Sequence, residues 1–169
     1  MSPVYLTAQG AIQSLNETET LGIFLGKTAE EGDVILLKGD LGAGKTTLTQ
    51  AIARGLDVPE EWYVTSPSFA LMHEYSGRIS LYHIDCYRLA GEDDVEGAGL
   101  TDYLHTKGIC VIEWPDRLGS FVPKERLEIT MAIDESERRK VSFSAHGASW
   151  VERLKQLMQI TNFFVSQGK

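Results

Sequence analysis

The stretch that decides the fold is GDLGAGKT, which runs from Gly39 to Thr46. It matches the pattern G-x-x-x-x-G-K-[S/T], a glycine-rich loop followed by a lysine and a hydroxyl residue. The unbroken apolar run 34–37 precedes it and predicts a strand buried on both faces. Residues 45–56 follow, and their apolar residues recur at helical spacing. A strand, this loop and a helix in that order predict a P-loop, which cradles the phosphates of a nucleotide.

The residue types of the loop indicate its chemistry. Glycines let the backbone curl so that its N–H groups point at phosphate oxygens, and the start of the next helix adds positive charge. Lys45 is expected to reach the β- and γ-phosphates, and the Thr46 hydroxyl to ligate Mg²⁺. We therefore predict ATP and Mg²⁺ as cofactors, with the phosphates bound by Gly39, Asp40, Leu41, Gly42, Ala43, Gly44, Lys45, Thr46 and Thr47.

Two acidic residues close apolar runs further along the chain. Asp85 follows 79–84, and Glu113 follows 109–112. A carboxylate at a strand end beside a phosphate loop can hold Mg²⁺ or orient the attacking water, although each acid alone would equally be an ordinary strand-end residue. Hydrolysis needs both functions. The sequence therefore predicts Lys45, Asp85 and Glu113 as catalytic and Thr46, Asp85 and Glu113 as metal ligands, and it leaves open which carboxylate contacts the metal directly.

A hydroxyl-rich segment lies between the P-loop and these acids. In P-loop proteins this is a common place for a loop that senses the γ-phosphate or the metal. The alternative is a simple proline turn. The predicted switch loop consists of Thr65, Ser66, Pro67 and Ser68.

Motifs that are missing narrow the class of nucleotide-binding protein. The N/T-K-x-D motif of GTPases is not present, since the stretch 106–109 fails at its last position, and neither is the L-S-G-G-Q signature of ABC ATPases. The arginines are scattered, whereas a small-molecule kinase needs an arginine-rich lid over the transferred phosphoryl group. An ATPase is the leading hypothesis. A small-molecule kinase and a nucleotide-dependent binding module remain as alternatives.

The rest of the chain predicts one domain, 1–169, with an α/β fold. We expect a P-loop NTPase-like, three-layer arrangement, in which a mixed sheet combines parallel core strands with antiparallel hairpins. Ser14 and Glu17 form a capping box and predict the start of a helix. The other expected elements are a weak strand at 4–7, a hairpin over 69–87, a helix at 92–104, a buried strand at 109–112, a hairpin over 127–145 and a helix at 149–160.

Composition excludes some functions and partners. The chain has 169 residues and a net charge of −8, which argues against nucleic-acid binding by this protein alone. No apolar run approaches the roughly 20 residues that span a bilayer, and no signal peptide is recognisable. The two cysteines lie in apolar runs and are interpreted as buried thiols of a cytoplasmic protein. The mixed-charge cluster 135–140 is interpreted as a solvated turn, and the four histidines as structural.

Four stretches together resemble one family. They are GDLGAGKTT at 39–47, TSPSF at 65–69, HIDCYRL at 83–89 and EWP at 113–115. Their order and spacing are similar to those of the TsaE family, also called YjeE, over roughly 14–127. Ser68 stands where that family commonly has threonine, a change that keeps the hydroxyl.

The resemblance implies a function. TsaE proteins are bacterial ATPases required for threonylcarbamoyladenosine, a modification beside the anticodon of tRNA. They bind the TsaD–TsaB heterodimer, and their ATP cycle supports its turnover, so tRNA is contacted only through the complex. By this resemblance Asp85 and Glu113 are the magnesium and hydrolysis carboxylates, 65–68 is the switch loop, Trp114 is the family's tryptophan, and Thr18 lies near the nucleotide base. The oligomeric state and the step that ATP serves stay open.

Overall fold

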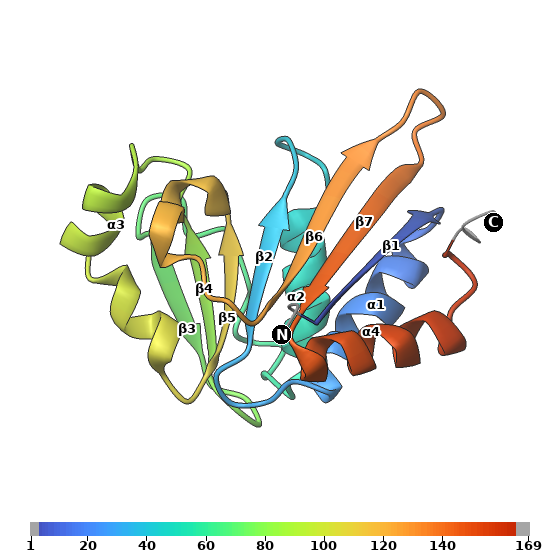
Figure 1. Cartoon of the computed structure of the whole chain (residues 1–169), viewed down its shortest axis with the longest axis horizontal. Helices are drawn as coiled ribbons and strands as arrows, with labels where there is room; N and C mark the ends of the chain where they lie inside the picture. The colour runs from blue at the N-terminus through green and yellow to red at the C-terminus, as the bar shows by residue number, and fades with distance from the viewer. Residues whose placement is uncertain (1–3, 165–169) are drawn as a thin grey trace.

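The computed structural model describes residues 4–164, which form one seven-stranded sheet with helices on both faces (Figure 1). The strand order is β1-β7-β6-β2-β5-β4-β3. The strands are β1 Tyr5–Ile12, β2 Val34–Lys38, β3 Met72–Tyr75, β4 Leu81–Asp85, β5 Ile109–Glu113, β6 Arg126–Ile133 and β7 Arg139–His146. The α-helices are α1 Leu15–Lys27, α2 Lys45–Gly55, α3 Glu92–Gly97 and α4 Ala148–Ile160, and the 3₁₀ helices are η1 Leu100–His105 and η2 Pro115–Phe121.

The sheet is mixed, as the sequence predicts. β6, β2, β5 and β4 run parallel in its centre, whereas β3 pairs antiparallel with β4, and β7 pairs antiparallel with β6 and β1. Every residue of β5 and all but the last of β2 are buried. Their unbroken apolar runs are explained by this position, because a central parallel strand is covered on both faces.

Two separate apolar cores lie on the two faces of the sheet. The larger core packs α1, α2 and α4 against one face and includes Leu81 and Val111. The smaller core packs α3, η1 and η2 against the other face and includes Ile84 and Ile112. Since neighbouring residues of a strand point to opposite faces, His83, Asp85 and Glu113 share the face that α1 and α2 cover.

Helices α1 and α2 approach each other more closely than side chains normally allow. A Cβ atom on Gly22 would overlap Ala51 of α2, and one on Gly26 would overlap the backbone at Ile52. Gly55 of α2 meets α1 in the same way. Glycine is therefore required at this crossing, which fixes α2, and with it the glycine loop, relative to the sheet.

Several predicted boundaries differ from the observed ones. The predicted helix 92–104 is broken at Gly99, whose φ of 73° lies in the left-handed region, into α3 and η1. β1 is longer than the predicted strand 4–7, because it pairs with β7 along its whole length. The helix η2 was not predicted. The N-cap at Ser14 is confirmed, since its Oγ accepts from the N–H of Glu17 at 3.2 Å.

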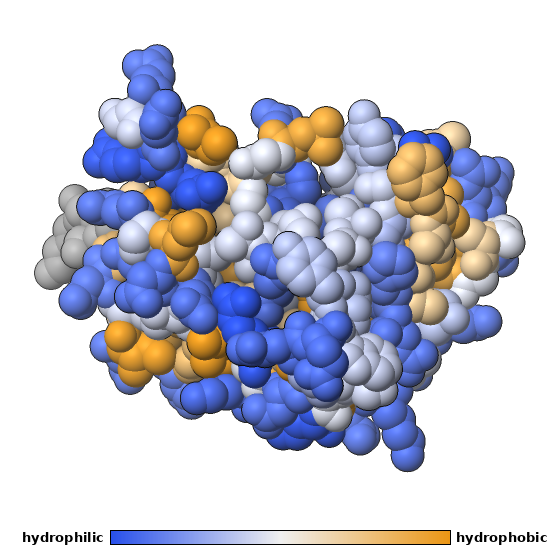
Figure 2. Space-filling model, turned by 180° about the vertical axis from the view of Figure 1, so that it is seen from behind, coloured by the Kyte–Doolittle hydropathy of each residue, from blue (hydrophilic) through white to orange (hydrophobic). Residues whose placement is uncertain are grey.

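The surface carries no single large apolar face in the view from behind, where apolar side chains form several separate groups among polar ones (Figure 2). Across 4–164, none of the helices combines the length and apolar content that crossing a membrane requires.

Candidate functional site

The glycine loop, residues 39–44, joins the end of β2 to the start of α2. Gly39, Gly42 and Gly44 have φ values of 146°, 82° and 105°, which L side chains rarely adopt. A Cβ on Gly39 would also overlap the backbone carbonyl of Met131 on β6. The two glycines that define the motif, Gly39 and Gly44, and the additional Gly42 are thus favoured by backbone geometry. The loop ends at Gly44, the N-cap of α2, whose carbonyl accepts the first helical hydrogen bond from the N–H of Leu48 at 3.0 Å.

A cleft of about 340 Å³ lies beside this loop at the carboxyl ends of the parallel strands. In open α/β sheets this edge is where ligands bind. β4 and β5 place Asp85 directly opposite Glu113 in register. The residues that line the cleft are Leu41, Gly42, Ala43, Gly44, Lys45, Thr46, Thr47, Ser66, Ser68, Asp85, Tyr87, Glu113, Trp114 and Arg139. The fold therefore brings most of the predicted site residues together.

Lys45 begins α2 and is only 6% exposed. Its Nζ donates to the carbonyl of Asp40 at 3.1 Å and also to the carbonyl of Gly39. The ammonium group lies 4.7 Å from the centre of the Trp114 ring, a distance at which the face of an aromatic ring attracts a cation. Backbone carbonyls and an aromatic ring, rather than a carboxylate, hold this positive charge at the cleft.

Asp85 connects the end of β4 to the predicted switch loop. Its Oδ2 accepts hydrogen bonds from the hydroxyls of Ser66 at 2.9 Å and Ser68 at 3.1 Å. Its Oδ1 accepts from the backbone N–H of Tyr87 at 2.9 Å. The carboxylate is 3% exposed, so these bonds matter for its stability in the interior. Any movement of residues 65–68 would change the surroundings of Asp85 directly.

Glu113 ends β5 and is also 3% exposed. Its Oε1 lies 3.2 Å from Nε2 of His83, a fully buried residue of β4. The sequence interpretation gave His83 a structural role and did not connect it with Glu113. Part of the signal was available, because His83 precedes Asp85 by two residues on the same strand and strand alternation places the two on one face. The contact with Glu113 depends on the register between β4 and β5.

Arg139 is the cleft residue that the sequence interpretation placed wrongly. The cluster 135–140 was expected to be a solvated turn, and the turn is formed around Asp134 and Arg138. Arg139, however, begins β7, and its Nε donates to the carbonyl of Ala43 in the glycine loop at 3.2 Å. The cause is the sheet order: β6 lies next to β2, so the end of the β6–β7 hairpin meets the loop that follows β2.

Five predicted site residues do not line the cleft, namely Gly39, Asp40, Thr18, Thr65 and Pro67. The carbonyls of Gly39 and Asp40 accept from Lys45 instead. Thr18 is buried in α1, and its Oγ1 has no hydrogen-bond partner within residues 4–164. It precedes Gly22 by four residues, on the side of α1 where Gly22 meets α2. Its role near the base stays a prediction. The N–H of Thr65 donates to the hydroxyl of Tyr75 at 3.3 Å, which positions the start of the switch loop.

Cys86 follows Asp85 but does not add a nucleophile to the site. Burial, and secondarily the charge of Asp85, raise the pKa of its thiol to about 12. Burial likewise raises the pKa of the Cys110 thiol to about 12. Both thiols stay protonated near neutral pH, and both cysteines are free and buried, as predicted.

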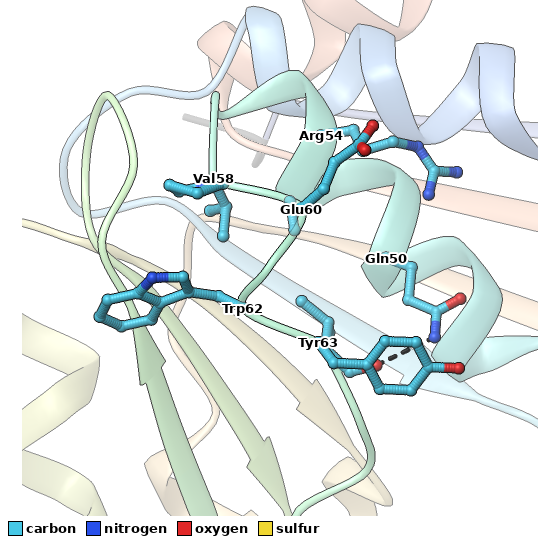
Figure 3. A pocket seen from close by; sticks show the side chains of 9 residues that line it. Gln50, Arg54, Val58, Glu60, Trp62 and Tyr63 are labelled. Carbon is cyan, nitrogen blue, oxygen red and sulfur yellow. Dashed lines mark hydrogen bonds between the residues drawn. The ribbon is translucent and has the colours of Figure 1, made fainter.

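A second cavity of about 230 Å³ lies beside the segment that leads into the switch loop (Figure 3). α2 lines one side of it and residues 58–64 the other, with Trp62 and Tyr63 partly exposed. The amide of Gln50 donates to the carbonyl of Val64 at 2.9 Å and ties the segment to α2. None of the predicted site residues lines this cavity.

Known proteins are similar to this chain along most of its length. The family described as "Threonylcarbamoyl adenosine biosynthesis protein TsaE" matches residues 12–141. The tRNA threonylcarbamoyladenosine biosynthesis protein TsaE of Bacillus subtilis is 37% identical over 147 residues, 86% of this chain and 90% of that protein. Its counterpart in Treponema pallidum is 38% identical over 130 residues, 77% of this chain and 95% of that protein.

A solved structure is similar as well. The crystal structure of Bacillus subtilis YdiB superposes with a TM-score of 0.72 at 31% sequence identity, covering 96% of this chain and 99% of that one. The residues matched by the family, 12–141, include the glycine loop, Asp85, Glu113 and residues 65–68. The chain therefore belongs to the TsaE family.

Proposed function

We propose that this protein binds Mg-ATP in the cleft and hydrolyses it as the ATPase subunit of the bacterial tRNA threonylcarbamoyladenosine modification complex. The P-loop NTPase-like character of the fold is part of this proposal. One observation carries it: a glycine loop, two buried strand-end carboxylates and two switch-loop hydroxyls meet in a single cleft. Membership of the TsaE family supports the link to threonylcarbamoyladenosine biosynthesis.

The cleft suits the polyphosphate of ATP. The loop glycines expose backbone N–H groups at the start of α2, where the helix dipole favours an anion. Lys45 and Arg139 add two positive charges to the wall of the cleft, in a protein whose net charge is −8. A phosphate group entering here would replace the loop carbonyls that now accept from Lys45.

The oxygen donors of the site fit Mg²⁺. Within residues 4–164 no group of three or more His, Cys, Asp or Glu side chains gathers as a metal site. Mg²⁺ does not need one, because it is held by one or two protein oxygens together with water and phosphate oxygens. Thr46, Asp85 and Glu113 offer such oxygens. When bound, the ion would supply positive charge at the transferring phosphoryl group.

We assign different tasks to the two carboxylates. Attack of water on the γ-phosphorus breaks the bond to the β-phosphate oxygen and yields ADP and phosphate, so the water must be oriented. Glu113, held in place by a buried neighbour, is suited to orienting it. Asp85, bonded to Ser66 and Ser68, is suited to linking the metal side of the site to the switch loop.

The partners proposed are TsaD and TsaB. An acidic ATPase is a poor ligand for tRNA, so tRNA would be held by the transferase rather than by this chain. Two free buried thiols agree with a cytoplasmic location.

The test is ATP turnover by the isolated chain and then with TsaD and TsaB added. We expect slow hydrolysis alone, an increase with the two partners, and no increase with small hydroxyl acceptors. Phosphorylation of such an acceptor without partner proteins would instead identify a kinase. Equal turnover with and without the partners would contradict partner control.

A further inference from the structure

His83 is the fully buried histidine that contacts Glu113 beneath the cleft. It lies in β4 directly opposite Val111 of β5, in the register that also places Asp85 opposite Glu113. His83 therefore lies one layer below the two carboxylates, on the same face of the sheet.

His83 and Glu113 contact each other inside the protein, and the chemistry of the carboxylate indicates which of them donates the hydrogen bond. Nε2 of His83 and Oε1 of Glu113 are 3.2 Å apart, and the two side chains are 0% and 4% exposed. A carboxylate accepts hydrogen bonds and does not donate them, so this contact is a hydrogen bond when Nε2 of His83 carries the hydrogen. Nδ1 is buried without a hydrogen-bond partner in the described part of the chain. The ring of His83 thus has a single polar partner there, and that partner is Glu113.

We propose that His83 is a positioning residue for ATP hydrolysis: its Nε2–H bond to Oε1 fixes the rotamer of Glu113. The bond leaves Oε2 as the oxygen that can face the cleft lined by Glu113. A glutamate side chain otherwise samples many rotamers, and only a few would orient a water correctly. This inference rests on the proposed function, which gives Glu113 the task of orienting that water.

If His83 only filled space in the core, its substitutions would have different effects on hydrolysis. Core packing would be satisfied by an apolar side chain of similar volume, whereas positioning requires a donor at the place of Nε2. Glutamine places its amide nitrogen near that point, asparagine places it nearer to Nδ1, and leucine offers no donor. The three substitutions His83→Gln, His83→Asn and His83→Leu therefore separate the two roles.

The kinetic experiment measures single-turnover hydrolysis and Mg-ATP affinity with TsaD and TsaB present. We expect His83→Leu and His83→Asn to slow hydrolysis by about 10- to 100-fold while affinity stays within about threefold. His83→Gln should recover most of the rate. Val111→Ala is the matched control, because it removes buried volume in the same layer without touching the bond, and its rate per folded molecule should be unchanged. A wild-type rate in His83→Leu, or equal losses in His83→Gln and His83→Leu, would overturn the proposal.

A double-mutant comparison tests whether His83 acts through Glu113. In a Glu113→Ala background, the further change His83→Leu should leave the residual hydrolysis rate unaltered. If the two losses multiply instead, His83 affects the reaction by another route and the positioning role is wrong.

A third measurement does not depend on hydrolysis. The long-range ¹H–¹⁵N spectrum of histidine-labelled protein, without nucleotide, should show His83 as the Nε2–H tautomer, and this signal should shift in Glu113→Ala. The chain has four histidines, so His83→Gln identifies the resonance. An Nδ1–H tautomer would overturn the proposal. Failure of the wild-type protein to hydrolyse ATP would instead reject the proposed function, while the spectrum still decides whether the bond exists.

Discussion

At the residue scale, the cleft combines opposite charges that are each held by a specific neighbour. Lys45 is held by loop carbonyls and Trp114, Asp85 by the switch-loop hydroxyls, and Glu113 by His83. Each charged group is almost fully buried, so its hydrogen bonds determine where it points. The geometry of the site therefore depends on pairs of residues rather than on single ones.

Arg139→Ala tests the residue that only the structure placed in the site. We expect Mg-ATP affinity to fall about 10- to 100-fold, since a charge-assisted contact to phosphate contributes on the order of 1.5–3 kcal/mol. Arg138→Ala is the matched control, because Arg138 bonds Asp134 in the exposed turn. Isothermal titration of both variants measures the effect. Equal affinities in the two variants would show that Arg139 only supports the hairpin.

At the scale of elements, the predicted switch loop is held to the end of β4 because the hydroxyls of Ser66 and Ser68 both donate to the carboxylate of Asp85. Ser66→Ala combined with Ser68→Ala removes the two hydroxyl donors to the buried Asp85 and leaves the backbone N–H of Tyr87. We expect amide hydrogen exchange across 65–71 to accelerate by about 10-fold or more, because bonds to a charged group contribute over 1 kcal/mol each. Ser76→Ala, in the exposed β3–β4 turn, should change nothing. Unchanged exchange in the double variant would mean that Pro67 and the backbone alone fix the loop.

The crossing of α1 and α2 gives a second prediction about elements. Gly26→Ala forces a methyl group against the backbone of α2, so the free energy of unfolding should fall by about 2 kcal/mol. Gly97→Ala is the control, because that glycine also lies in a helix but has open space around it. Urea denaturation of both variants makes the comparison. Similar stabilities would show that the two helices can separate at no cost.

The sequence predicts elements better than it predicts their contacts. The apolar runs of β2 and β5 and the cap at Ser14 are local patterns, and the structure has them where expected. Arg139 reaches the glycine loop from 96 residues away, through a strand order that no local pattern specifies. The bond from His83 to Glu113 likewise depends on the register between β4 and β5. The missed parts of the site are thus those created by tertiary pairing.

At the scale of the whole molecule, the two buried thiols predict a loss of stability at high pH. Burial raises the pKa of Cys86 and Cys110 from the ordinary 9.0 to about 12, so the unfolded chain loses these protons first as pH rises. Their contribution is constant below about pH 9, and stability declines between about pH 9 and 12. Urea titrations across this range should show a smaller decline when both cysteines are replaced by alanine. An identical decline in the double variant would mean that the thiols are exposed in the folded chain.

In the proposed mechanism the cleft hydrolyses Mg-ATP, and Glu113 orients the attacking water. Single-turnover hydrolysis by Glu113→Ala, measured alongside Mg-ATP affinity with TsaD and TsaB present, is the decisive experiment. We expect the affinity to stay within about threefold of wild type, whereas the rate falls by about 100-fold or more, since orientation is lost but the phosphate contacts remain. Hydrolysis by Glu113→Ala at the wild-type rate would refute this mechanism and show that Glu113 is an ordinary acid at the end of a strand.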